Sequence, residues 1–289
     1  MSLHAVDRLH PIEVARFRNF AEGIVFDASG YAYVSHGRVI SRIAPDGKRS
    51  VWAETGAPGG HKILPDGSHL VCDASRRAIL RLDAQGKILG AIASGGDGKP
   101  LVEPNDLTLD PKGGFYFTDL GKRYARNRDH GGLYYALPDG SKIVELVHPM
   151  LSPNGVGLSP DEKTVYVADT ETSRLFAFDI VEPGVLRKEP FPAPYTGRLV
   201  CGLPGFQRFD SLAVEASGNI AVATLITGHI TVIAPSGNVV RQVKMPDVYP
   251  TNICFGGRDM KTAYITLSGS GQLAAMDWPE PGLRLNFQE

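Results

Sequence analysis

The sequence predicts an all-β protein, a six-bladed β-propeller, and three observations support this prediction. Gly and Pro account for 33 and 21 of the 289 residues and interrupt the chain at short intervals. Runs of alternating apolar residues lie between them, and segments with a helical period are few. Turn sequences built on Asp-Gly or a near equivalent recur as PDG at 45–47, 65–67 and 138–140, AQG at 84–86 and PSG at 235–237.

Alignment of the chain on these turns shows six copies of one strand–turn–strand unit. The copies are AEGIVFDASGYAYVS, GHKILPDGSHLVCD, PNDLTLDPKGGFYFTD, PNGVGLSPDEKTVYVAD, FDSLAVEASGNIAVAT and TNICFGGRDMKTAYIT. Most of them continue into a third strand, such as AILRLD at 78–83 or RLFAFDI at 174–180. Six modules of three or four antiparallel strands match a propeller, in which radial packing leaves only short edges exposed.

The repeats leave no room for a second domain, so we expect residues 1–289 to form one propeller domain. The Pro-rich stretch 181–200 falls between two copies and is interpreted as a long connection. Two segments, IEVARF at 12–17 and LRLNF at 283–287, are both candidates for the strand that completes the last blade.

The composition favours a small-molecule partner. Lys plus Arg number 30 and Asp plus Glu number 31, so no net charge attracts the protein to nucleic acid or to a membrane surface. No apolar run approaches the length of about 20 residues that a membrane span needs, and the first residues lack a secretion signal. We therefore expect a cytoplasmic protein, a monomer or a weak homo-oligomer, whose three cysteines Cys72, Cys201 and Cys254 are reduced and buried.

Polar residues recur at one position of the repeat, five residues before the turn. They are Glu22, His61, Asn105, Asn154, Asp210 and Asn252. Innermost strands line the channel of a propeller, so these side chains are expected to form a ring at its mouth. A single Asn or Asp at a strand start usually makes a local turn, but six at one register favour a shared site.

Such a ring predicts a cation, because buried carboxylates repel one another and lose hydration unless a positive charge compensates them. The oxygen atoms of Glu, Asp and Asn suit Ca²⁺, the expected ion, with Mg²⁺ and Mn²⁺ as alternatives. His61 could shift the preference toward Zn²⁺ or Fe²⁺.

A second set of acids, Asp73, Asp119 and Asp169, closes the second strand of three repeats. These acids either cap turns and brace neighbouring blades or support the site, and Asp119 is the strongest candidate for a role in substrate binding. The loop at 121–132 contains Lys122, Arg123, Arg126 and Arg128. It is either a solvated face or a lid that holds a substrate carboxylate, with Arg123 as the expected substrate-binding residue.

The sequence resembles the SMP-30/gluconolactonase, or regucalcin-like, family of six-bladed propeller lactonases. The matching stretches are AEGIVFD at 21–27, PNDLTLDPKGGFYFTD at 104–119, PNGVGLSPDEKTVYVAD at 153–169, FDSLAVEASGNIAVAT at 209–224 and NICFGGRDMKTAYIT at 252–266. The resemblance implies one divalent cation held by Glu22, Asn154 and Asp210, with Asn105 beside it. Sugar-lactone members of the family often have Arg two residues before the position of Asn105, where this chain has Glu103.

The predicted function is the hydrolysis of a small lactone, a cyclic ester, by a water activated at the metal. One cation polarises the carbonyl and stabilises the tetrahedral oxyanion. Asp210 is expected to be both a metal ligand and the general base, Asn105 to orient the lactone oxygen, and His61 to contact the substrate. The alternatives are a propeller enzyme without metal catalysis, as in strictosidine synthase-like proteins, and a noncatalytic propeller that binds a ligand or a protein.

Overall fold

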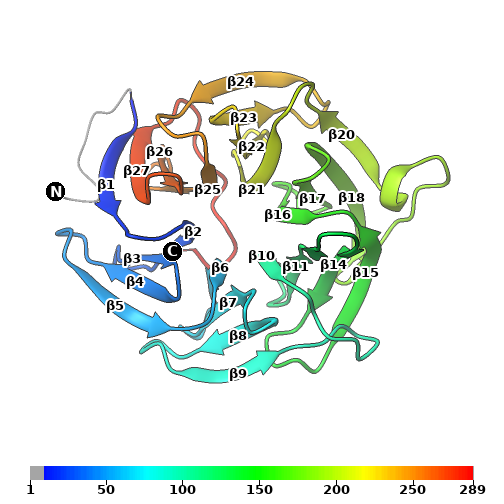
Figure 1. The fold of residues 1–289 in the computed structure, drawn as a ribbon, viewed down its shortest axis with the longest axis horizontal. Helices are drawn as coiled ribbons and strands as arrows, with labels where there is room; N and C mark the ends of the chain where they lie inside the picture. The colour runs from blue at the N-terminus through cyan, green and yellow to red at the C-terminus, as the bar shows by residue number, and fades with distance from the viewer. Residues whose placement is uncertain (1–9, 289) are drawn as a thin grey trace.

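The computed structural model describes residues 10–288 and confirms the predicted all-β propeller, with six antiparallel blades arranged around one axis (Figure 1). From the axis outward, the first three blades comprise β2 (Ala21–Phe26), β3 (Ala32–His36), β4 (Val39–Ile43) and β5 (Arg49–Glu54); β6 (Pro58–Ile63), β7 (His69–Asp73), β8 (Ala78–Leu82) and β9 (Ile88–Ile92); and β10 (Pro104–Leu109), β11 (Phe115–Asp119), β14 (Gly131–Ala136) and β15 (Ile143–Met150). The other three comprise β16 (Pro153–Leu158), β17 (Thr164–Asp169), β18 (Arg174–Glu182) and β20 (Arg198–Gly202); β21 (Arg208–Val214), β22 (Ile220–Leu225), β23 (His229–Ile233) and β24 (Val239–Lys244); and β25 (Pro250–Gly256), β26 (Thr262–Leu267), β27 (Gln272–Asp277) and β1 (Ile12–Arg16). Short elements outside this plan are β12 (Lys122–Arg123), β13 (Arg128–Asp129), β19 (Val185–Leu186) and the 3₁₀ helix η1 (Pro194–Thr196).

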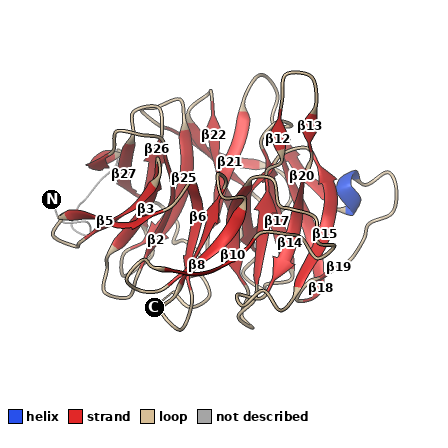
Figure 2. Cartoon of the chain, turned by 60° about the horizontal axis from the view of Figure 1, so that its bottom comes forward, coloured by secondary structure: helices blue, strands red, loops and turns tan. Residues whose placement is uncertain are grey.

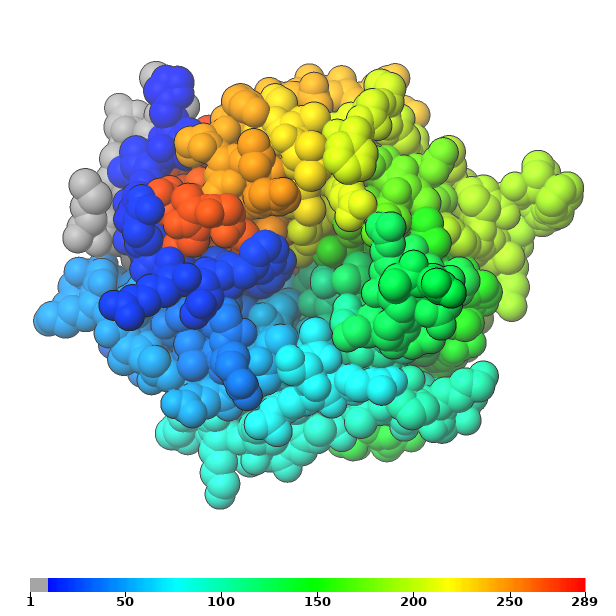
Figure 3. All heavy atoms as spheres, in the orientation of Figure 1, coloured from blue at the N-terminus to red at the C-terminus, as the bar shows by residue number. Residues whose placement is uncertain are grey.

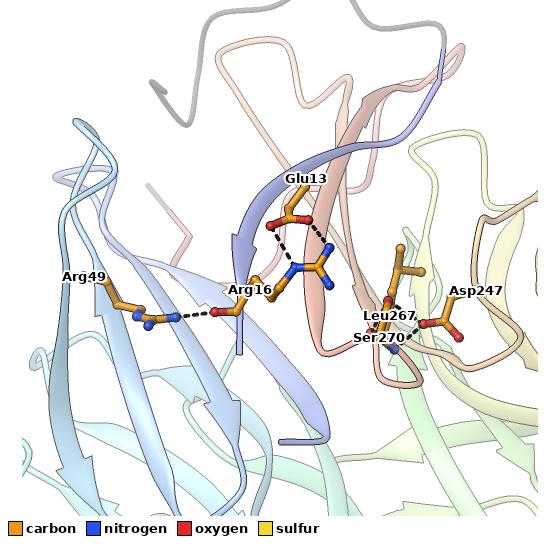
Figure 4. A network of polar contacts seen from close by, with 6 residues as sticks. All are labelled: Glu13, Arg16, Arg49, Asp247, Leu267 and Ser270. Atoms are coloured by element: carbon orange, nitrogen blue, oxygen red, sulfur yellow. Dashed lines mark hydrogen bonds and ion pairs between the residues drawn. The ribbon is translucent and has the colours of Figure 1, made fainter. Parts of the chain in front are cut away.

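The ring is closed by the N-terminal segment. Strand β1 pairs antiparallel with β27, so the 12–17 candidate supplies the last strand and the 283–287 candidate is wrong. Within β1, Glu13 and Arg16 form an ion pair of 2.6 Å (Figure 4). Figure 4 also shows the contact that holds β1 to the first blade: the Arg49 Nη1 of β5 donates to the Arg16 carbonyl oxygen at 2.6 Å. The first blade is thereby joined to the strand that completes the last one.

A second contact in Figure 4 joins two loops of the last blade. The Ser270 backbone N–H and Oγ both donate to the Asp247 carboxylate at 2.7 Å. The loop before β25 is therefore fixed to the loop between β26 and β27.

The core consists of six apolar clusters in the described part of the chain, and each cluster lies between two neighbouring blades. The cluster between the third and fourth blades, for example, joins Tyr116 and Leu133 to Val167 and Phe176, all nearly inaccessible to solvent. Burial of one such large side chain contributes about 1.5–3 kcal/mol. Stability therefore resides between the blades, around the channel.

The predicted Asp-Gly turns are confirmed. Gly47 and Gly67 have φ of 85° and 78°, in the left-handed region that favours glycine. In the first of them the Gly47 N–H donates to the Ala44 carbonyl at 2.8 Å, while the Asp46 carboxylate accepts the Lys48 N–H at 3.0 Å. These turns all connect strands at a blade's end, as the repeat required.

The two ends of the central channel differ. We call the end at which the six innermost strands begin the mouth; Figure 2 shows the β12–β13 hairpin rising on this face and the C-terminus on the other. The opposite, closed end is crossed by residues 283–288. The tail is held there because the Leu283 N–H donates to Val214 at 2.8 Å and the Asn286 Nδ2 to the Leu109 carbonyl at 3.1 Å.

The structure contains no long apolar helix of the kind that spans a bilayer, within residues 10–288.

Candidate metal centre

Glycine allows the innermost strands to meet at the mouth. A Cβ added to Gly23 would lie 2.2 Å from the Gly59 carbonyl oxygen of the next blade. A Cβ added to Gly155 would lie 2.7 Å from the Asp210 carbonyl oxygen. Both distances are far below van der Waals contact, so the backbones touch only because these residues have no side chain. The residues just before these glycines, Glu22 and Asn154, are thereby brought to the same small space.

Each of the six innermost strands also carries a register shift near its start. In β10 the pairing with β11 shifts between Pro104 and Leu107, and β16 has the same irregularity between Pro153 and Val156. A β-bulge re-aims the side chains within it. Strict alternation of side chains therefore does not hold at the mouth, where the polar residues lie.

Three carboxyl groups from three blades interact at the mouth: Glu22 of β2, Asp106 of β10 and Asp210 of β21. Burial raises the pKa of Glu22 well above its usual range, and the charges of Asp210 and Asp106 raise it further. Burial also raises the pKa of Asp210 to about 8, with Asp106 adding to the shift and the Asn154 amide opposing it. The cluster is thus short of positive charge.

Asn154 completes this group. Its side chain is 4% exposed, and its Nδ2 donates to the Thr170 Oγ1 at 3.1 Å. The same amide also donates a hydrogen bond that lowers the pKa of Asp210, while its Oδ1 atom is buried and has no hydrogen-bond donor. A buried carbonyl oxygen without a donor is costly, and a cation would satisfy it.

The group fits a hard divalent cation. Glu22, Asp210 and the Asn154 Oδ1 provide oxygen donors only, the type that Ca²⁺, Mg²⁺ and Mn²⁺ prefer. Within residues 10–288 there is no set of three or more His, Cys, Asp and Glu side chains placed to hold a metal. The candidate centre does not need one, because its third donor is an amide.

The other two amides of the expected ring also lie at innermost strand starts. Asn105 precedes Asp106 in β10 and is partly exposed, whereas Asn252 of β25 is only 7% exposed and borders the channel cavity below the acids. Asn105 is therefore the amide that a ligand arriving from solvent can reach.

Asp106 was not among the predicted site residues. It is 3% exposed, its carboxylate accepts the Leu107 N–H at 2.8 Å, and burial raises its pKa while Lys62 lowers it. The available signal was the unusual pair of polar residues in the PND sequence. Counting back from the turn assigned only Asn105 to the channel, whereas the structure brings Asp106 close to the other acids as well.

The ring position expected for His61 is wrong. The turn of the second blade begins at Leu64, whose N–H donates to Ser68 at 2.8 Å, as the Asp27 N–H does to Tyr31 at 3.0 Å. Five residues before Leu64 is Gly59, so the PDG sequence placed the register two residues too late.

His61 instead lies between the first two blades. It has no exposed surface, and its Nε2 is 2.8 Å from the His69 Nδ1. The rings of Trp52 and Tyr33 pack around it at centroid distances of 5.9 and 6.0 Å. Contact with a substrate and a shift toward Zn²⁺ or Fe²⁺ have no support in this position.

Asp119 makes the contacts expected of an acid that caps a turn and braces the neighbouring segment of the chain, the first of the two roles considered for it. Its carboxylate accepts the backbone N–H groups of Val102 and Glu103 at 2.6 and 2.7 Å and that of Gly121 at 3.1 Å. Asp73 accepts the N–H groups of residues 56 and 57 at the equivalent place in the previous blade. The substrate-binding role expected for Asp119 gains no contact from the structure.

The basic loop at 121–132 forms the β12–β13 hairpin on the mouth face, where Figure 3 shows it standing beside the centre of the ring. Lys122 pairs with Glu103 at 2.7 Å. Arg123 is exposed. Lys122 of the hairpin thus neutralises Glu103, the acid at the position where sugar-lactone members of the family often have Arg.

The six-bladed ring, with acids and an amide gathered on its axis, defines a class: propellers with a small polar site at the mouth of the channel. A family model described as "SMP-30/Gluconolactonase/LRE-like region" matches residues 20–269, and the chain belongs to this family.

Curated relatives and solved structures agree with this assignment. The chain is 30% identical to lactonase drp35 of Staphylococcus saprophyticus over 247 residues, which cover 81% of this chain and 72% of the relative. A gluconolactonase from Xanthomonas campestris superimposes with a TM-score of 0.78 at 25% identity, covering 96% of this chain and 94% of the other. The calcium-binding protein regucalcin of Agrobacterium tumefaciens, with a TM-score of 0.77 at 20% identity and coverage of 96% and 98%, supports the fold alone.

Proposed function

We propose that the chain is a divalent-metal-dependent lactonase that opens a small lactone to the hydroxy acid. The observation that carries the proposal is the unpaired, buried Asn154 Oδ1 beside the acids Glu22 and Asp210. Lactonase drp35 and the Xanthomonas gluconolactonase, as they are named, support the choice of substrate class.

Glu22, Asn154 and Asp210 would hold the cation, with Ca²⁺ as the expected ion because all three donors are oxygens. When bound, the cation polarises the lactone carbonyl and lowers the pKa of a water. Asp106 contributes a third negative charge beside these ligands.

The chain's own residues supply proton transfer and orientation. Asp210 accepts a proton from the attacking water as the water oxygen bonds to the carbonyl carbon. It returns that proton to the ring oxygen when the bond between this oxygen and the carbonyl carbon breaks, so the products are one carboxyl and one hydroxyl group. Asn105, the partly exposed amide, donates through Nδ2 to a lactone oxygen, and Arg123 on the hairpin contacts the substrate from the face above.

Hydrolysis of a panel of lactones, with and without a chelator, tests the proposal. We expect turnover that chelation removes and added Ca²⁺ restores. Glu22→Gln and Asp210→Asn should each lower kcat/KM by at least about 10²-fold, the loss typical of removing one group that acts in the transition state.

The matched control is Asp46→Asn, which removes a carboxylate from an exposed turn at the other end of a blade. It should leave kcat/KM unchanged. Lactone hydrolysis that persists after complete metal removal would refute the metal dependence, and a panel without any turnover would refute the lactonase assignment.

A further inference from the structure

A cavity of about 130 Å³ lies in the channel between the acids and the closed end. Its walls are mostly apolar side chains of the innermost strands, and residues 283–288 border it from below. Asp106 and Asn252 border it on the side of the acids. Lys62 of β6 also borders this space on the innermost strands, whereas the other two charged side chains of the lining, Glu162 and Arg284, belong to a turn and to the tail at the closed end.

The ammonium group of Lys62 has few partners. Its Nζ donates to the His61 carbonyl oxygen at 3.3 Å, a long hydrogen bond. Among the described residues, no carboxylate oxygen comes within the 4.0 Å of a direct ion pair with it. Within the candidate centre its charge acts on Asp106, whose ionised form it stabilises.

The charges around the upper channel can be counted. Glu22, Asp106 and Asp210 carry three negative charges when all are ionised, and Lys62 carries one positive charge. Two negative charges remain for an ion to compensate. In a site with little solvent, uncompensated charge is costly whatever its sign.

We propose that Lys62 selects the charge of the ion: its ammonium makes a divalent cation the one that brings the centre to neutrality and disfavours a trivalent one. This inference rests on the proposed metal centre. It concerns selectivity, whereas the three donors of the centre account for binding. Lys62 acts through the field of its charge, so it is a specificity-determining residue that touches neither metal nor substrate.

The test compares two ions of similar ligand preference and different charge, Ca²⁺ and Tb³⁺, by calorimetric titration of the full chain. The ratio of the two affinities is the informative quantity, because both ions start from the same metal-free protein. Differences in the folding or protonation of that state therefore cancel from the ratio. The Lys62 ammonium repels a bound Tb³⁺ more strongly than a bound Ca²⁺, because Tb³⁺ carries one more positive charge. Lys62→Met removes this repulsion, so the ratio of Tb³⁺ to Ca²⁺ affinity should rise about tenfold.

Two further variants separate charge from packing. Lys62→Arg keeps the charge, and its ratio should equal that of the wild type; Lys62→Gln removes the charge with a polar side chain and should behave as Lys62→Met. Lys112→Met removes a lysine from an exposed turn at the closed end and should leave the ratio unchanged.

Each outcome decides. A ratio that stays constant in both neutral variants, while both ions still bind, would overturn the role of Lys62 and leave the metal centre standing. Wild-type protein that binds neither ion would overturn the proposed metal centre itself. An equal rise in Lys62→Arg would show that side-chain shape, rather than charge, controls the selectivity.

Discussion

Removal of one site carboxylate should stabilise the metal-free protein, and Asp210→Asn is the variant in which this can be measured. The pKa of Asp210 rises from 3.8 in the unfolded chain to about 8 in the folded one. Between these values the folded state holds a proton that the unfolded state has released. Stability must therefore fall as the pH rises from about 4 to about 8.

The size of this effect follows from the two pKa values. At about 1.4 kcal/mol for each pH unit between them, the charged Asp210 costs the folded state at most about 6 kcal/mol above pH 8. Unfolding entropies of about 2.1 cal/mol/K per residue give about 0.6 kcal/mol for each kelvin in a chain of this length. Asp210→Asn keeps the size of the side chain without its charge, so its Tm at pH 9 in chelator should exceed that of the wild type by about 5–10 °C.

Thermal unfolding followed by circular dichroism at pH 5 and pH 9 is the assay. At pH 5 the two proteins should unfold within a few degrees of each other, because Asp210 is then protonated. Ca²⁺ at 1,000 times its Kd adds about 4 kcal/mol to a protein that binds it, so at pH 9 it should raise the Tm of the wild type by about 7 °C and raise that of Asp210→Asn by less. A variant that unfolds below the wild type at pH 9 in chelator would refute this reasoning, and Asp46→Asn should show no change under any condition.

Two further predictions concern the surroundings of the site. Gly155→Ala should lower the free energy of unfolding by about 1–3 kcal/mol and weaken Ca²⁺ binding, because its Cβ would meet the backbone of Asp210. Urea unfolding measures the first effect and calorimetric titration the second. Gly90→Ala, which has open space around its Cβ, should be neutral in both measurements. Burial lowers the pKa of His69 to about 4 and that of His61 well below its usual range, so the unfolded chain binds protons more readily than the folded chain below about pH 6.5. The stability advantage of the wild type over His69→Gln should therefore shrink between pH 7 and pH 5 in urea unfolding, and an advantage independent of pH would contradict this account.

The repeat made most of the fold and part of the site predictable from sequence. Counting back from the turns identified Glu22, Asn154 and Asp210 because each lies four residues before the last residue of its innermost strand. The same counting failed for His61, because the turn of its blade begins at Leu64 and the conspicuous PDG sequence lies within that turn.

Two features depend on geometry that residue patterns do not encode. Asp106 joins the acids through a bulge, and a period of two cannot anticipate an extra residue in a strand. The closing strand could not be chosen either, because both terminal segments alternate apolar and polar residues. Only the position of the chain ends around the ring, with β1 beside β27, decides between them.

The cost of burying the acids at the mouth is separate from the packing that holds the blades together. The acids at the mouth are buried at a cost, with the pKa of two of them raised by mutual repulsion as well as by burial. The apolar clusters that hold the blades together lie outside the channel and contain none of these acids. We therefore expect a change in charge at the axis to alter the stability of the whole protein without repacking any blade interface.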